Sequence, residues 1–292
     1  DIITIEPAAS GKRTIRVWQI AVGCVALVLL AFVVNIKSVT KEPATLSLEG
    51  TDQSPKEEWA EKGELIPDPA LREELAKILE ISKDQITPKK LSELTELSLS
   101  QKKIESIQGL QHCDALRTLN FSYNKIEDLS PIAKLENLES LILYANPFKK
   151  LPELSTLKKV KGLSFYQCGN LRDISGIKRM IWLKTLSLKE VYLSNISSIA
   201  GLVNLKSLNL QYNKIEDLSP IASMDKLETL TVNYNPELTK VPDLSALKKV
   251  KSISFHQCRK LRDISGIKGM TWLETLGLGE VYLTDISPIT GL

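Results

Sequence analysis

The feature that most constrains the fold of this 292-residue chain is a pattern of aliphatic residues that returns every 22 or 23 residues. Residues 116–137, LRTLNFSYNKIEDLSPIAKLEN, hold one period, with aliphatic or aromatic residues at fixed offsets and Asn124 before a turn. A period of this length predicts a solenoid, in which each unit buries its apolar side chains against its neighbours. The first apolar position of each period is filled by Leu94, Leu116, Leu138, Val160, Leu183, Leu205, Leu227, Val250 and Leu273.

Each period opens with L-x-x-L-x-L, the signature of a leucine-rich repeat, which predicts a short strand with its leucines turned inward. The return segment, for example DLSPIA, is expected to be a tight 3₁₀ or extended piece, because Pro131 and Pro220 discourage a regular helix. The prediction is an α/β-type solenoid: a leucine-rich-repeat horseshoe with a parallel concave sheet and a helical N-terminal cap, preceded by one transmembrane helix. The repeats are assigned to residues 94–292.

A longer period lies over the short one. The sequence NKIEDLSPIA occurs identically at residues 124–133 and 213–222, and residues 160–182 return with few changes as 250–272. The unit is therefore a block of four coils, about 90 residues long. Internal duplication of this block is the simplest explanation, because a stacked array grows by adding whole units.

Residues 65–93 are predicted to form the cap. Asp68 is placed to accept from the free N–H groups of a helix start, and Pro69 suits the first helical position. The first coil of a solenoid has no neighbour on one side, so a helix with one apolar stripe is needed there to cover its core. The stripe expected from helical spacing is Leu71, Leu75, Ile78 and Leu79.

An uncharged run begins at Val17 and ends at Ile36. Its 20 residues would span roughly 30 Å as a helix, the thickness of the hydrocarbon core of a bilayer. We therefore predict a transmembrane helix at residues 17–36. The three cations before the run (Lys12, Arg13 and Arg16) favour a cytoplasmic N-terminal segment at residues 1–16. Residues 37–64 are polar and read as a flexible stalk, so the repeats are expected to be extracytoplasmic.

Three other interpretations of the apolar run stay open. A cleaved signal peptide would have a shorter core and a small-residue cleavage site. The AVGC sequence at residues 21–24 resembles a lipoprotein cleavage box, although ten more apolar residues follow it. A buried soluble helix is the least favoured, because the flanking segments offer it no partner.

The cap sequence IPDPALREEL…ITPKKLSELTELSLS, followed by N-K-I-x-D-L-S-P-I-A repeats, resembles the internalin-type leucine-rich-repeat proteins of bacteria over about residues 65–292. The resemblance implies exposure on the cell surface and binding of other proteins on the concave sheet. No cell-wall sorting signal is present in the sequence. Four repeats carry another residue where the family has asparagine: Cys168, Val191, Cys258 and Val281.

Candidate chemical groups are few. The two histidines, His112 and His256, have no neighbours at metal-ligand spacing, and no phosphate loop or nucleophile motif appears. We therefore predict no enzyme activity, no cofactor and no metal site. The formal net charge of +3 is too small to predict nucleic-acid binding. Cys168 and Cys258 lie four coils apart, roughly 19 Å at the spacing of stacked strands, so they are expected to be free thiols.

The candidate binding surface is the outward side of the parallel sheet, because alternate side chains of each strand point away from the core. Tyrosines beside small polar residues suit protein recognition, since tyrosine gives a large contact area at low entropic cost. The alternative is that the tyrosines stack on one another and only stiffen the sheet. The predicted binding residues are Thr118, Asn120, Ser122, Tyr123, Tyr144, Tyr166, Tyr212, Tyr234 and His256.

These observations favour a membrane-anchored, extracytoplasmic module that recognises another protein on its concave face. A second hypothesis makes the repeats the external sensor of a transmembrane signalling enzyme, such as a kinase, whose catalytic domain lies upstream of Asp1. A third is a scaffold with no specific partner. We also expect further coils or a cap after Leu292, because the last coil would otherwise leave an apolar face and a strand edge uncovered.

Overall fold

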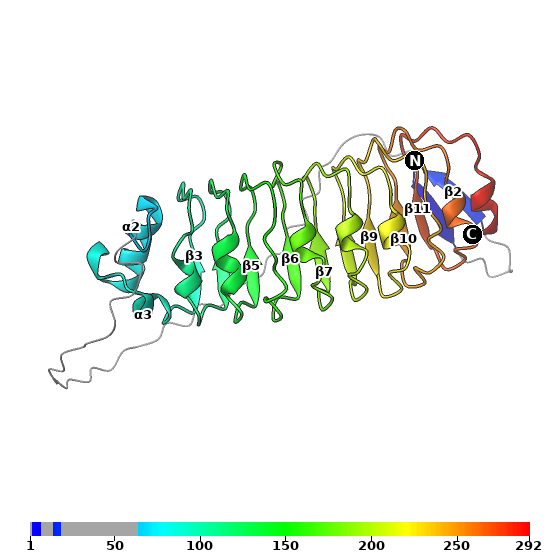
Figure 1. The fold of residues 1–292 in the computed structure, drawn as a ribbon. Coiled ribbons are helices and arrows are strands. Elements are labelled where there is room, and N and C mark those ends of the chain that lie inside the picture. Colours follow the sequence, from blue (N-terminus) through cyan, green and yellow to red (C-terminus); the bar gives the residue numbers. More distant parts are fainter. Residues whose placement is uncertain (1, 7–13, 19–63) are drawn as a thin grey trace.

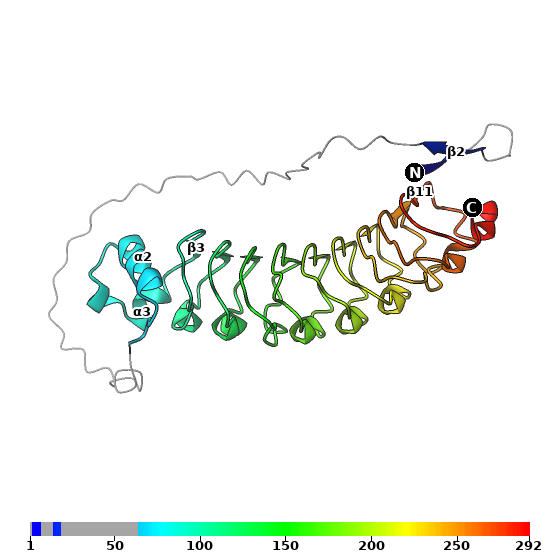
Figure 2. The same ribbon diagram turned by 90° about the horizontal axis from the view of Figure 1, so that it is seen from above.

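The structure, a computed structural model, describes residues 2–6, 14–18 and 64–292. From residue 94 onward the chain winds into a curved solenoid with short strands on the inner side and 3₁₀ turns on the outer side (Figure 1, Figure 2). The predicted parallel sheet is confirmed, since each coil supplies one three-residue strand. These strands are β3 (Glu96–Ser98), β4 (Thr118–Asn120), β5 (Ser140–Ile142), β6 (Gly162–Ser164), β7 (Thr185–Ser187), β8 (Ser207–Asn209), β9 (Thr229–Thr231), β10 (Ser252–Ser254) and β11 (Thr275–Gly277).

Neighbouring strands are in register at the same position of the repeat. Leu119 of β4 faces Leu141 of β5, and Leu186 of β7 faces Leu208 of β8. These central leucines are buried, as the L-x-x-L-x-L pattern predicts. The ladder is interrupted between β5 and β6 and again between β9 and β10, which are equivalent places in the two copies of the four-coil block.

The return segments from η3 to η8 form 3₁₀ turns, and each begins with an Asp or Asn side chain that accepts from the backbone N–H two residues later. Asp128 Oδ1 accepts a hydrogen bond from Ser130 N at 2.9 Å, and Asp173 Oδ1 accepts from Ser175 N at 2.8 Å. The D-x-S sequence thus closes a tight turn before a helix can propagate. The turns are η2 (Leu110–His112), η3 (Ser130–Lys134), η4 (Ser175–Ile177), η5 (Ser197–Ile199), η6 (Ser219–Ile221), η7 (Ser265–Ile267) and η8 (Ser287–Gly291).

Buried asparagines tie successive coils together. Asn124 Nδ2 donates to Leu99 O at 2.7 Å in the preceding coil, while its Oδ1 accepts from Ile104 N at 3.1 Å. Two repeats that lack asparagine use cysteine in the same place: Cys168 Sγ lies 3.4 Å from Leu143 O. The predicted free thiols are confirmed, and the free, buried cysteines are Cys113, Cys168 and Cys258.

The cap consists of α2 (Pro69–Leu79), η1 (Lys83–Gln85) and α3 (Pro88–Leu91). Asp68 caps α2 as expected, and Leu71 and Leu75 are fully buried against the first coil. The predicted apolar stripe of α2 wrongly included Ile78, whose side chain is 44% exposed. Ile78 therefore faces solvent near the C-terminal end of α2, while Leu79 is partly buried against the core.

At the other end of the solenoid, β1 (Ile2–Glu6) and β2 (Thr14–Trp18) form an antiparallel hairpin, and β1 pairs antiparallel with β11. The expectation that this strand edge is uncovered is therefore wrong. The predicted transmembrane helix was to begin at Val17, but Val17 and Trp18 belong to β2. Its remaining residues, 19–36, lie outside the described part of the chain, as do residues 37–63 of the predicted stalk. Among the described residues, no helix is long and apolar enough to cross a membrane.

Candidate protein-binding surface

The floor of the concave face is made of small side chains. The first and third residues of each strand point outward on either side of the buried central residue, as the burial pattern of β4 shows. Thr118 and Asn120 of β4 lie on this floor and are half-buried, as predicted. The floor is shallow because most of its residues are serine, threonine or glycine.

The predicted tyrosines do not form a single row. Tyr123, Tyr212 and Tyr234 have positive φ angles of 58°, 56° and 61°. Tyr144 and Tyr166 instead stand one position earlier, directly before Ala145 and Gln167, which hold the positive φ in their coils. The tyrosines therefore belong to two adjacent rows. From the sequence alone, they had been placed in a single row.

The positive φ has a structural reason. It turns the N–H toward the next coil, where Tyr123 N donates to Tyr144 O at 2.7 Å and Tyr234 N donates to His256 O at 2.8 Å. A side chain at such a position is held by the backbone on both sides of the turn. Tyr212 thus projects from a rigid site, with 37% of its surface exposed.

Six side chains from the two rows form a continuous ridge along the edge of the sheet where the strands end. Tyr144 and Tyr166 meet edge to face at 6.0 Å between ring centroids, Tyr212 and Tyr234 stack at 4.1 Å, and Tyr234 meets His256 at 5.4 Å. Lys189 joins the two groups, because its Nζ lies 5.1 Å from the Tyr166 ring centroid and 5.5 Å from that of Tyr212. The aromatic ridge comprises Tyr144, Tyr166, Lys189, Tyr212, Tyr234 and His256.

Sequence analysis missed Lys189, although it lies 23 residues from both Tyr166 and Tyr212 and so occupies the same edge. Its ammonium group also lies 3.8 Å from the carboxylate of Glu190. Cation–π contact on two sides holds this lysine across the gap between the tyrosine pairs.

Four predicted residues lie outside the ridge: Thr118, on the floor of the concave face, and Asn120, Ser122 and Tyr123. Ser122 is buried, with 4% of its surface exposed, so it does not present a side chain to a partner. Asn120 uses its Oδ1 to accept from Ser122 N at 3.0 Å and is therefore partly occupied in shaping its own turn. Tyr123 is 46% exposed and remains available, but none of the described rings contacts it.

The phenols of Tyr166 and Tyr212 are held in their neutral form. Partial burial and the nearby negative charge of Glu190 raise the pKa of Tyr166. Burial, a hydrogen bond with Tyr234 and the charge of Glu190 raise the pKa of Tyr212. Both hydroxyl groups are therefore hydrogen-bond donors at neutral pH, beside rings that offer apolar contact.

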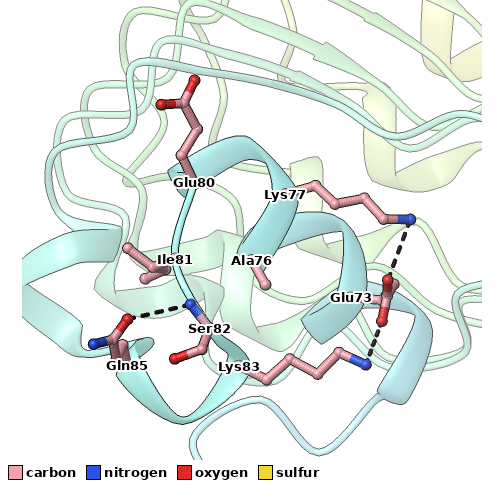
Figure 3. A pocket seen from close by; sticks show the side chains of 8 residues that line it. All are labelled: Glu73, Ala76, Lys77, Glu80, Ile81, Ser82, Lys83 and Gln85. Atoms are coloured by element: carbon pink, nitrogen blue, oxygen red, sulfur yellow. Dashed lines mark hydrogen bonds and ion pairs between the residues drawn. The ribbon is translucent and has the colours of Figure 1, made fainter.

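Two hollows elsewhere are less suited to recognition. The one in the cap (Figure 3) carries charges that compensate one another, because Glu73 pairs with both Lys77 and Lys83. The other lies beside η4 and is lined by Glu153, Ser175, Lys178, Arg179 and Ile181. Within the residues that the structure describes, no three His, Cys, Asp or Glu side chains are grouped to hold a metal ion.

The fold and repeats define a leucine-rich-repeat protein: the family described as Leucine Rich repeats (2 copies) matches residues 92–134, 114–159, 181–223 and 203–249. Among 258 matching solved chains is an internalin (inlF) of Listeria monocytogenes, with 28% identity and a TM-score of 0.60, covering 78% of this chain and 74% of that one. The chain thus carries leucine-rich repeats over these residues and is similar in sequence and fold to the internalins.

Two further solved structures support the architecture. Internalin C2 (inlC2) of Listeria monocytogenes is 26% identical, with a TM-score of 0.50, covering 78% of this chain and 91% of that chain. A leucine-rich-repeat protein of Leptospira interrogans is 24% identical, with a TM-score of 0.54, covering 70% of this chain and 60% of that chain. The latter likeness shows the fold alone. No curated protein matches the sequence.

Proposed function

We propose that this protein recognises another protein through the concave side of its solenoid, with the aromatic ridge as the main contact. An internalin-like repeat fold is one that serves protein–protein recognition. The observation that carries the finer proposal is the ridge itself: five rings and one lysine form a single partly exposed line beside a floor of small residues.

The ridge suits a binding role because its side chains are already ordered. Ring stacking and backbone hydrogen bonds hold Tyr212 and Tyr234, so little side-chain entropy remains to be lost on binding. The sequence left open that the tyrosines only stack on one another and stiffen the sheet. Such stacking is compatible with a binding role. The small floor leaves room for a partner to reach the strands.

The test is site-specific photo-crosslinking in intact cells. A photoreactive phenylalanine analogue replaces Tyr212 in one variant and Tyr192, an exposed tyrosine outside the ridge, in the other. We expect a discrete protein adduct from position 212 and none from 192. Equal adducts at both positions, or none at 212, would contradict the proposal.

The recovered partner then allows a titration with matched variants. Replacing both Tyr212 and Tyr234 with alanine removes the stacked pair and is expected to weaken binding at least tenfold, as loss of aromatic hot spots does. Tyr192→Ala is the control and is expected to leave the affinity within twofold. An unchanged affinity in the double variant would remove the ridge from the interface.

We also propose that residues 17–36 anchor the protein in a membrane, with residues 1–16 cytoplasmic and the repeats extracytoplasmic. The support is the uncharged run and the cations before it. The pairing of β1 with β11 in one chain requires both strands on the same side of the bilayer, so that pairing and this orientation are alternatives that protease accessibility separates. Protease added to intact cells is expected to remove the repeats; full protection would contradict the proposed orientation.

A further inference from the structure

A row of charged residues lies directly before the strands, along the edge of the sheet opposite the aromatic ridge. Because neighbouring strands are in register, consecutive members of this row stand side by side in adjacent coils. From β4 to β11 the row is Arg117, Glu139, Lys161, Lys184, Lys206, Glu228, Lys251 and Glu274.

Most of the row consists of ion pairs between adjacent coils. The Arg117 guanidinium lies 4.0 Å from Glu139, Lys206 Nζ lies 3.0 Å from Glu228, and Lys251 Nζ lies 3.2 Å from Glu274. Each pair places a cation before an anion along the chain. The remaining neighbours, Lys161 and Lys184, are both cations.

The two lysines have no counterion among residues 64–292. Lys161 Nζ donates to Lys158 O at 2.8 Å, and Lys184 Nζ makes no ion pair or hydrogen bond with the residues that the structure describes. Like charges on directly opposite positions of a sheet are destabilising. This place in the row therefore carries an uncompensated positive charge.

The duplicated block supplies an internal comparison. Lys251 and Glu274 are the copies of Lys161 and Lys184, ninety residues later in equivalent coils. The copy forms an ion pair, so the fold accepts glutamate at this position and does not need the second lysine. Packing alone does not explain Lys184.

The surroundings are open to a partner. Gly162 and Thr185, which follow the two lysines, leave a low floor between them and the ridge. The distance along the strand from Lys161 to Tyr166 is five residues, roughly 16 Å at about 3.3 Å per residue. Lys161 is exposed, and Lys184 is half-buried.

We propose that Lys161 and Lys184 form a carboxylate-binding subsite for an acidic segment of the protein partner. This inference rests on the proposed function, because it assigns a chemistry to part of the same face. Two lysines at adjacent, in-register positions of neighbouring coils match two carboxylates on one side of an extended peptide. A long polyanion fits less well, because Glu139 precedes the two lysines along the row and the neutralised Lys206–Glu228 ion pair follows them.

The test measures binding of a fluorescein-labelled (Glu-Ser)₄ peptide to the full chain in mild detergent, by fluorescence anisotropy at low salt. Its (Gln-Ser)₄ and (Lys-Ser)₄ analogues are the peptide controls. We expect the glutamate peptide to bind at least tenfold more tightly than either analogue. It should lose this advantage at about 500 mM salt, because salt screens interactions between exposed charges.

Two protein variants exploit the duplication. Lys184→Glu converts the subsite into the ion pair found in the copy and is expected to lower affinity for the glutamate peptide at least tenfold, without lowering the melting temperature. Glu274→Lys is the converse variant at the equivalent coil: it recreates the two-lysine arrangement beside Lys251 and is expected to retain binding and add a second site for the peptide. Equal affinity for the glutamate and glutamine peptides, or no effect of Lys184→Glu, would overturn the inference.

Two competitors identify other ligands. The inference would also be overturned if inorganic polyphosphate or vesicles of anionic phospholipid bound in a Lys184-dependent way and the glutamate peptide did not. Failure of the peptide experiment leaves the crosslinking result at Tyr212 as a separate measurement. A positive adduct there would show that recognition occurs but that the partner segment is not acidic.

Discussion

The carboxylate of Asp68, in the cap, accepts a hydrogen bond from the backbone N–H of Glu105 at 2.7 Å, in the first coil and 37 residues further along the chain. The same oxygen accepts from Ser106 N at 2.9 Å, while the other oxygen caps α2 through Leu71 N at 2.8 Å. One buried side chain thus starts the cap helix and fastens the cap to the solenoid.

Replacing Asp68 should therefore destabilise the protein more than loss of an ordinary helix cap. For Asp68→Asn we expect a loss of about 1–3 kcal/mol in the free energy of unfolding, because an amide NH₂ would face backbone donors. Asp84→Asn, an exposed change in η1, should alter it by less than about 0.5 kcal/mol. Urea unfolding of both variants measures the difference; equal stabilities would contradict the role of Asp68.

Asp68 should also contribute to acid sensitivity. Burial raises the pKa of this carboxyl group, but hydrogen bonds from Leu71, Ser106, Glu105 and Ala70 outweigh it and leave the pKa below its ordinary value of 3.8. A lowered folded-state pKa gives stability that is present above the unfolded value and is lost as the pH falls through the folded one. Below about pH 4, wild type should lose stability more steeply than Asp68→Asn.

Asn235 is completely buried and makes several backbone hydrogen bonds. Its Nδ2 donates to Leu210 O at 2.9 Å and Val232 O at 2.5 Å, and its Oδ1 accepts from Ile215 N at 3.1 Å. Asn235→Ala leaves these groups unpaired and should cost about 3 kcal/mol or more. Asn204→Ala, which removes exposed contacts only, should cost less than about 1 kcal/mol. Denaturant unfolding of the two variants compares the stability lost at a buried asparagine with the stability lost at an exposed one.

The three described cysteines should be chemically inert in the folded protein. Burial raises the pKa of Cys113 to about 12 and the pKa values of Cys168 and Cys258 to about 11. In a Cys24→Ser background, a thiol reagent at pH 8 should modify none of them until guanidinium is added, and then all three. Since the raised pKa favours the folded state below the unfolded value, this stability should be lost as the pH rises from about 9 toward 11. Rapid labelling of the native protein would contradict their burial.

Gly176 lies where two coils approach closely. A Cβ atom built on it would stand 1.9 Å from Pro152 O, whereas one on Gly201 would meet Lys178 O at an ordinary 3.5 Å. Gly176→Ala should therefore destabilise the protein by about 2 kcal/mol or more, as overpacking does. Gly201→Ala should have an effect of less than about 1 kcal/mol. Thermal unfolding of the pair tests this; similar melting temperatures would show that the coils can separate without cost.

Much of the architecture followed from local pattern. The 22- or 23-residue period placed each strand, because every Leu119-type position must be buried by the next coil. Asp68 and Pro69 marked the start of α2, because capping depends on a few adjacent residues. Ile78 was misplaced, because helical spacing states which side chains share a face but not how far the neighbouring coil extends.

The candidate site was predicted only in part. Tyr144, Tyr166, Tyr212, Tyr234 and His256 were found from their recurrence at the ends of strands. Lys189 was missed and Ser122 was wrongly placed on the surface, because ring contacts and burial join residues from different coils. The pairing of β1 with β11 likewise connects the two ends of the sequence, and no local pattern records it.

The sequence by itself determined the repeat, the cap and the identity of the buried aliphatic positions, since these depend on periodicity and on adjacent residues. Only the tertiary structure decided which side chains meet across coils. The rings of Tyr212 and Tyr234 stack, and Lys161 and Lys184 occupy adjacent positions without a counterion among the residues that the structure describes. The physical reason is that such contacts depend on the rotation of each coil about the solenoid axis and on the φ angle at each turn, and a repeat pattern specifies neither.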